Sequence, residues 1–226
     1  QALERRRQQV GVQPLRREVQ VAVEEITDVT DWYAPAAIVL MLQQFAIAFG
    51  ALSFVRERQL GIEEVYRVAP VGGTSSVLGK YLAYLALGAA IAAALTALVT
   101  AALGVPLVGG IGDLTVAMLL TLFASVGLGF VISLIARNDA QAVQYTMLVL
   151  LASLFFSGFF LALDQLRGPS TWVAYALPAS YGMRLLRDTM LRGAALDVEV
   201  VAGLAAYGTV LFLIALLGAR RRMTHA

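Results

Sequence analysis

Five apolar stretches, each long enough to cross a bilayer, dominate this sequence. A spanning helix needs about 20 mostly apolar residues, because each residue rises ~1.5 Å across a hydrocarbon core of ~30 Å. Strands that cross a membrane alternate apolar and polar residues, whereas these stretches are apolar on all sides. The sequence therefore predicts an all-α polytopic membrane protein, with spans at about 35–55, 82–104, 114–136, 141–163 and 199–219.

The composition supports this class and excludes several kinds of site. Hydrophobic residues make up 59% of the chain and charged residues 14%, against about 45–50% and ~25% in soluble domains. The mean hydropathy is +0.77. There is no cysteine, which excludes disulfides, thiol catalysis and cysteine metal sites. The single histidine, His225, is the penultimate residue, and we expect no metal or catalytic site there.

One segment, residues 73–80, superficially has the form of a phosphate-binding loop. Five residues separate Gly73 from Gly79, where the motif has about four, and Tyr81 stands where Ser or Thr would hold Mg²⁺. No charged residue lies in the middle of a span, as a proton relay would require. We therefore predict that the chain is not an enzyme and binds no cofactor, metal or nucleic acid itself.

The segment 56–80, between the first two spans, is rich in paired charges. Leu60, Ile62 and Val65 interleave there with Glu57, Glu63 and Glu64. A short helix over about 60–68 would have an apolar and a charged surface, and Pro70 and the glycines that follow would end it. The segment is either a docking element for a partner in water or a solvated interfacial helix with no partner.

Polar and aromatic side chains near the span ends are candidates for a substrate path. We name five of them: Gln43, Gln44, Phe155, Phe156 and Phe159. Glutamines can also bond between helices, and phenylalanines can also pack in the core or face lipid. The sequence alone does not decide whether these five residues line a substrate path or serve in packing.

The segments outside the five spans predict which parts of the chain lie on each side of the membrane. Residues 1–34 are polar, and we expect an extracytoplasmic segment that ends a larger soluble region, with a strand at 19–23 and a transmembrane domain over 35–226. In 164–198, arginines share one helical face opposite Met183, Leu186 and Met190, which predicts an interfacial or re-entrant helix. The arginines at 220–222 favour a cytoplasmic C-terminus, because basic residues flank spans on that side.

Several motifs, in this order and spacing, are similar to those of the permease subunit of type 2 ABC exporters, the ABC-2 membrane family. The resemblance runs from about Tyr33 to the C-terminus. It is carried by Tyr33-Ala34-Pro35-Ala36, Val55-Arg56-Glu57-Arg58-Gln59-Leu60-Gly61-Ile62-Glu63-Glu64, Ala69-Pro70-Val71, Leu78-Gly79-Lys80, Ile135-Ala136-Arg137-Asn138, Ser157-Gly158-Phe159 and Leu177-Pro178-Ala179-Ser180-Tyr181 with Leu186-Arg187.

The resemblance implies a fold of six spans, of which five are present here. It also implies a second permease copy, surrounding membrane lipids, and an ABC ATPase, separate or fused, that binds ATP and Mg²⁺. In the family the loop after the second span docks on the ATPase. The corresponding residues here are Glu57, Arg58, Gly61, Ile62, Glu63, Glu64 and Arg67.

The function implied is export of hydrophobic or amphipathic, drug-like molecules across the bacterial inner membrane by alternating access. A lipid or glycolipid exporter is the alternative within the family. A scaffold or channel subunit outside the ABC class would also explain the charge-free spans, but it would not explain the ordered motifs.

Overall fold

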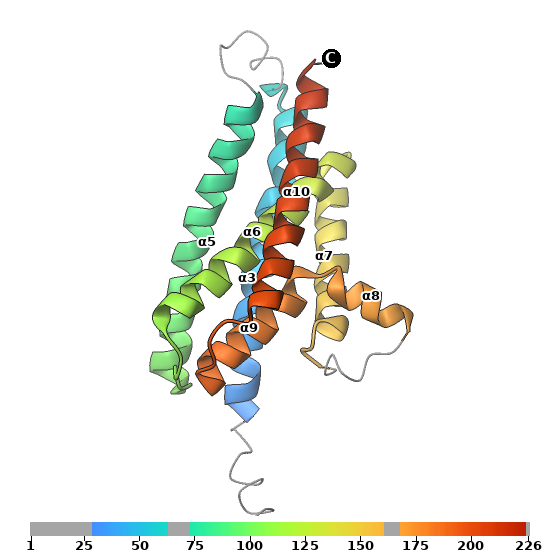
Figure 1. Cartoon of the computed structure of the whole chain (residues 1–226). Coiled ribbons are helices and arrows are strands. Elements are labelled where there is room, and N and C mark those ends of the chain that lie inside the picture. Colours follow the sequence, from blue (N-terminus) through green and yellow to red (C-terminus); the bar gives the residue numbers. More distant parts are fainter. Residues whose placement is uncertain (1–28, 63–72, 161–167, 225–226) are drawn as a thin grey trace, which may run out of the picture.

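The structure, a computed structural model, describes residues 29–62, 73–160 and 168–224. It consists there of α-helices, and no strand occurs among these residues. Long helices are α3 (Val29–Gln59), α5 (Gly73–Leu103), α6 (Ile111–Ile135), α7 (Asp139–Phe156) and α10 (Val198–Thr224). Two short helices, α8 (Pro169–Tyr175) and α9 (Pro178–Arg192), lie between α7 and α10 (Figure 1).

In the described part of the chain, five helices are long and apolar enough to cross a membrane. They are α3, α5, α6, α7 and α10, which confirms the predicted all-α polytopic membrane fold. The predicted strand at 19–23 lies outside the described residues. The helix predicted in 164–198 is present as α9, in which Met183, Leu186 and Met190 are buried while Arg184 and Arg192 are exposed; its interfacial or re-entrant position stays a prediction.

The helix bounds differ from the apolar stretches at several ends. Helix α3 continues through the charged residues to Gln59, and α5 begins at Gly73 rather than near 82. Charged side chains at a helix end can reach water, so the helix need not stop where the apolar run stops. Helix α7 ends at Phe156, and Gly158 follows with a φ of 93°, a conformation that glycine adopts most readily.

Helices α3 and α6 cross at the centre of the molecule, where two glycines let their backbones touch. A Cβ added to Gly129 would lie 2.6 Å from the Ile47 carbonyl oxygen, and one added to Gly50 would lie 3.0 Å from the Gly129 Cα. Small residues permit this close approach between helices in lipid. Figure 1 shows α6 slanting across the bundle, with α5 and α7 on opposite sides and α10 in front.

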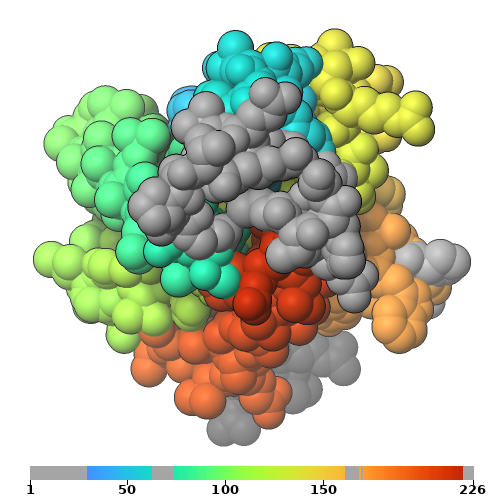
Figure 2. All heavy atoms as spheres, turned by 90° about the horizontal axis from the view of Figure 1, so that it is seen from above, coloured from blue at the N-terminus to red at the C-terminus, as the bar shows by residue number. Residues whose placement is uncertain are grey.

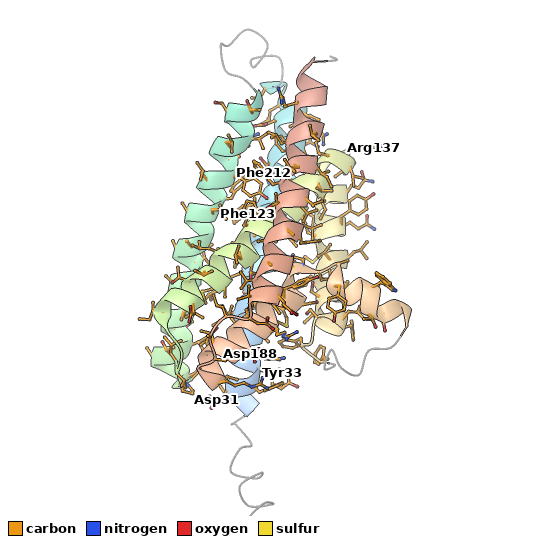
Figure 3. The ribbon with its side chains drawn as sticks, viewed as in Figure 1. Asp31, Tyr33, Phe123, Arg137, Asp188 and Phe212 are labelled. Atoms are coloured by element: carbon orange, nitrogen blue, oxygen red, sulfur yellow. The ribbon has the colours of Figure 1, made fainter. Side chains whose placement is uncertain are left out.

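An aromatic cluster joins α5, α6 and α10. The Tyr81 ring lies edge-on to Phe130 at 5.2 Å and to Phe212 at 4.9 Å, and its hydroxyl donates to the Phe123 carbonyl oxygen at 2.9 Å. Edge-to-face pairs of this kind add to the packing energy of the rings. Phe123 and Phe212 lie side by side, with 6.1 Å between their ring centres (Figure 3). Tyr81 therefore has a packing role, consistent with its position inside α5.

Seen from above, the described helices form one compact body, with α5, α7 and α9 at its edges (Figure 2). The end of α3, the start of α5, the α6–α7 turn and the end of α10 lie at one end of the molecule (Figure 1). The start of α3 and helix α9 lie towards the other end. The docking residues that the structure describes, Glu57, Arg58, Gly61 and Ile62, thus lie at the same end as the end of α10.

Candidate functional site

Three consecutive charged residues in the last turn of α3, namely Arg56, Glu57 and Arg58, each reach a different helix. We call these residues and their partners the charged clamp. Three successive residues of a helix point about 100° apart, so one turn can contact neighbours on three sides. Because Glu57 and Arg58 are also predicted docking residues, the clamp lies at the start of the predicted docking segment.

Glu57 binds α5 through an ion pair with Lys80. The two side chains are only 16% exposed each, and the Lys80 Nζ also lies 4.1 Å from the centre of the Phe54 ring. Removing one partner of a buried pair leaves an uncompensated charge, which costs more than the intact pair contributes. Glu57 and Lys80 therefore hold the end of α3 against α5.

Arg58 binds the carboxyl end of α6. Its Nη2 donates to the Ser133 carbonyl oxygen at 2.8 Å and to the Ala136 carbonyl oxygen at 2.7 Å. The last carbonyls of a helix lack hydrogen-bond partners within the helix and carry partial negative charge. A guanidinium supplies both hydrogen-bond donors and a positive charge. The Ser133 Oγ in turn accepts from the Phe54 amide at 3.0 Å and the Val55 amide at 3.2 Å. The ends of α3 and α6 are thus joined by a side chain of α3 that binds the α6 backbone and by a side chain of α6 that binds the α3 backbone.

Arg56 makes the weakest contact of the clamp. Its Nε lies 3.4 Å from the Asp139 Oδ2 at the start of α7, and the side chains are 63% and 40% exposed. Exposed ion pairs contribute about 0–1 kcal/mol. The clamp therefore holds α5 and α6 firmly and α7 loosely.

The rest of the predicted docking segment is described only in part. The chain turns at Leu60 and Gly61, Gly61 has a φ of 68°, and Ile62 already has helical geometry. Leu60 is 72% exposed. Glu63, Glu64 and Arg67 lie outside the described residues.

The five predicted substrate-path residues do not share a surface. Gln43 is fully buried at the middle of α3, while Phe155 on α7 is exposed. Phe156 is half-buried, and Phe159 packs against Tyr33 at 5.3 Å between ring centres.

The two glutamines differ in their surroundings. Gln43 donates from Nε2 to the Ser153 Oγ at 2.6 Å, and its Oε1 accepts from the Ala179 amide at 2.7 Å. Gln44 is half-buried, and its Oε1 has no partner among the described residues. Gln43 therefore caps the amino end of α9 and ties it to α3 and α7, which is a structural role that the sequence left open.

A cavity of about 590 Å³ lies at the opposite end from the clamp, between the start of α3, the residues after α7, helix α9 and the start of α10. Its wall includes Arg187, whose guanidinium carbon lies 4.3 Å from the centre of the Trp32 ring. Asp188 and Tyr33 mark this end of the molecule in Figure 3, and Arg137 marks the clamp end. None of the five predicted path residues lines this cavity.

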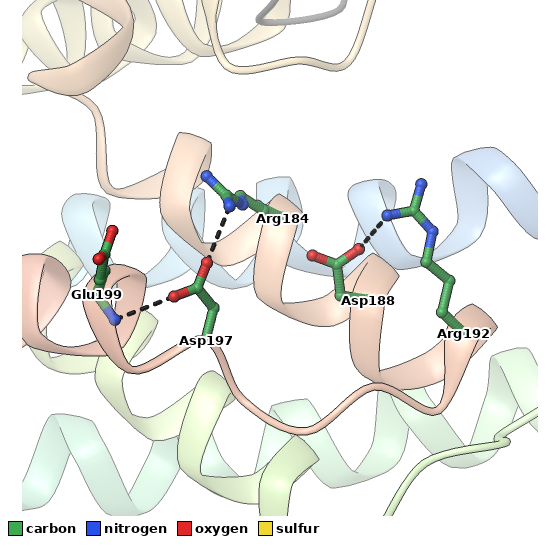
Figure 4. A network of polar contacts seen from close by, with 5 residues as sticks. All are labelled: Arg184, Asp188, Arg192, Asp197 and Glu199. Atoms are coloured by element: carbon green, nitrogen blue, oxygen red, sulfur yellow. Dashed lines mark hydrogen bonds and ion pairs between the residues drawn. The ribbon is translucent and has the colours of Figure 1, made fainter.

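Two ion pairs border the cavity (Figure 4). Arg184 binds Asp197 at 2.9 Å, and Arg192 binds Asp188 at 2.7 Å along α9. Asp197 also accepts from the Glu199 amide at 3.0 Å, which caps the start of α10. The sequence showed the charged face of α9 but not the cavity, because the other walls come from segments far away in the chain.

Burial lowers the pKa of the Arg187 guanidinium, and Arg192 adds to this effect while Tyr33 and Asp188 oppose it. The ordinary pKa of arginine is so high that the group stays charged. Among the described residues, no cluster of His, Asp and Glu could hold a metal ion.

Comparison with known families now decides the class of the protein. The family "ABC-2 type transporter" matches residues 9–191. The chain belongs to the ABC-2 type transporter family. This membership removes the alternative of a scaffold or channel outside the ABC class.

Relatives in the family come from bacteria and from a eukaryote. The chain is 31% identical to "Probable multidrug ABC transporter permease YbhS" of Escherichia coli (strain K12), over 80% of this chain and 46% of that protein. It is 27% identical to "Inner membrane transport permease YhhJ" of the same strain, over 82% of this chain and 50% of that protein. It is 29% identical to "ABC transporter G family member 20" of Dictyostelium discoideum, over 81% of this chain and 26% of that protein. The chain thus spans half or less of the length of these ABC-2 relatives.

Proposed function

We propose that this chain is the permease part of an ATP-driven ABC exporter, in which the charged clamp transmits movement from an ATPase to the membrane helices. The observation that carries the proposal is the set of contacts from the predicted docking residues Glu57 and Arg58 to α5 and α6. Membership of the ABC-2 family supports the transporter class.

The mechanism follows from the stiffness of these contacts. ATP binding draws two ATPase domains together and displaces the segment after Gln59. Helix α3 is continuous from Gln59 to Val29, so a displacement at its end moves the whole helix. The Glu57–Lys80 pair and the Arg58 bonds would carry α5 and α6 along. A cavity between two permease copies would then change the side to which it opens.

The orientation we propose has the clamp in the cytoplasm. Arg56, Arg58, Lys80 and Arg137 lie at the clamp end, as does the end of α10 (Figure 1). Basic residues near span ends concentrate on the cytoplasmic side, which supports this orientation. The membrane would be the bacterial inner membrane, with the C-terminus in the cytoplasm.

The substrate we propose is a hydrophobic or amphipathic small molecule. The support is the printed description of one relative as a multidrug permease. ATP and Mg²⁺ would bind the ATPase and not this chain, and a second permease copy would complete the transport path.

The test is to isolate the tagged permease from its native membrane and identify what remains bound. Leu60 is exposed at the turn after α3, so Leu60→Asp removes an apolar contact to a partner without disturbing the core. Leu103→Asp, at an exposed leucine at the far end of α5, is the matched control. We expect an ABC ATPase to accompany the wild type and the control and to be lost from Leu60→Asp. Absence of an ATPase from the folded wild type, with none fused to the chain, would refute the proposal.

A further inference from the structure

Arg187 is a cation whose hydrogen bonds are only partly satisfied. Its Nη1 donates to the Gly158 carbonyl oxygen at 2.9 Å and its Nε to the Trp32 carbonyl oxygen at 3.3 Å. Its Nη2 is buried and has no partner among the described residues. A desolvated donor of this kind costs free energy until an acceptor reaches it.

The charges around the cavity leave Arg187 uncompensated. The neighbouring carboxylates of Asp188 and Asp197 are already paired with Arg192 and Arg184 (Figure 4). Within the described part of the chain, no carboxylate lies within ion-pair distance of Arg187. Glu199 also lines the cavity, but it is exposed, so its repulsion is screened by water and salt more strongly than the attraction of the half-buried Arg187.

The cavity wall also offers apolar and aromatic surface. Trp32, Tyr175 and Tyr181 line it, together with Met183 and Val200. It lies where α3 and α10 begin, and aromatic residues gather where spans meet the membrane surface. A ligand there would have its charged group beside Arg187 and its apolar part against the rings.

We propose that this cavity binds the anionic headgroup of an amphiphile, a phosphate or a carboxylate, with Arg187 as the charge that recognises it. A small turn of the guanidinium would direct Nη2 towards the anion while the Trp32 ring supports its face. The site is separate from the charged clamp and requires neither ATP nor the ATPase for binding. A phosphate could come from a lipid headgroup or be free in solution, and the apolar wall favours the amphiphile.

The test is calorimetric titration of the purified intact protein in nanodiscs of uncharged lipid. Octyl phosphate is the probe, inorganic phosphate represents the headgroup alone, and octyl glucoside represents an uncharged amphiphile of the same chain length. Arg187→Gln removes the proposed recognition charge. Arg137→Gln is the matched control, because it removes an exposed cation at the clamp end, away from the cavity.

We expect saturable binding of octyl phosphate to the wild type and the control, and about tenfold or more weaker binding to Arg187→Gln, as for the loss of a charge-assisted hydrogen bond. Octyl glucoside should give no saturable binding. Equal binding of octyl phosphate to Arg187→Gln, or none to the wild type, would overturn the site. Equal binding of inorganic phosphate and octyl phosphate would overturn the amphiphile and assign a free anion.

The carbonyl bonds of Arg187 also hold α9, so Arg187→Gln could lose its fold. Arg187→Lys is the second variant, because it keeps the charge and loses the planar fork that reaches both carbonyls and the anion. A folded Arg187→Lys should bind octyl phosphate several-fold more weakly than the wild type. Binding as tight as that of the wild type would contradict recognition by the guanidinium.

Discussion

At the scale of single residues, Gln43 determines how three helices meet in the middle of the molecule. Its side chain reaches Ser153 on α7 and the first turn of α9. Pro178 begins α9 and no side chain of its own segment caps it, so the cap must come from another helix.

The first prediction concerns this cap. Gln43→Leu leaves the Ser153 hydroxyl and the Ala179 amide without partners, and should lower the free energy of unfolding by about 1–3 kcal/mol. Unfolding in mixed micelles measures the change. Gln44→Leu is the control, because the Gln44 Oε1 already lacks a partner and its loss should cost less. An equal loss of stability in both variants would show that the cap contributes nothing.

The second prediction concerns the Glu57–Lys80 pair. Glu57→Lys or Lys80→Glu alone should lower the free energy of unfolding by about 1–3 kcal/mol, and the double reversal should recover at least ~1 kcal/mol of it. The same reversal of Arg56 and Asp139 should change stability by less than about 1 kcal/mol, because those side chains are exposed. No recovery in the Glu57–Lys80 double variant would mean that the residues are not coupled.

At the scale of elements, the crossing of α3 and α6 depends on two glycines. The nearest atoms to an added Cβ at Gly129 belong to the backbone of α3, which cannot move aside as a side chain can. The bundle is therefore tightly packed where α3 and α6 meet, so α3 would carry α6 along in the proposed movement.

The third prediction tests this crossing. Gly129→Ala should force the helices apart and lower the free energy of unfolding by about 1–3 kcal/mol, as overpacking does. Gly79→Ala is the control, because a Cβ there meets nothing within 4 Å and should stabilise α5 by up to about 1 kcal/mol. Unfolding curves in mixed micelles compare the two. Equal stability of the two variants would argue against a tight crossing.

The helices themselves were predictable from sequence, and their ends were not. Apolar length alone identifies the five spans, because the bilayer sets how many apolar residues a helix needs. The charged clamp was read as part of a loop, since sequence does not show that Glu57 and Lys80 face each other across two helices. The Gln43 amide would suit either a substrate path or a helix cap. Only its burial and its hydrogen bonds in the structure distinguish the two roles.

At the scale of the whole molecule, the two ends have different chemistry. The clamp end has ion pairs and capped carbonyls that connect α3 to its neighbours. The opposite end has an open cavity with aromatic walls and with the Arg187 guanidinium, which has no ion-pair partner among the described residues. The helices between them are apolar, and α3 and α6 are the most buried of them. The proposed transporter would couple to the ATPase at one end and bind amphiphiles at the other.

The most direct test of the central claim is the amount of transport per ATP hydrolysed, in vesicles that contain the complete complex. Arg58→Gln breaks the bonds to α6, and Arg56→Gln removes only the exposed contact to α7. We expect Arg58→Gln to fold, to hydrolyse ATP and to lose at least about fivefold in transport per ATP, as for the loss of a typical coupling free energy. Arg56→Gln should transport as the wild type does. Unchanged transport per ATP in a folded Arg58→Gln would contradict the claim that the clamp transmits the movement.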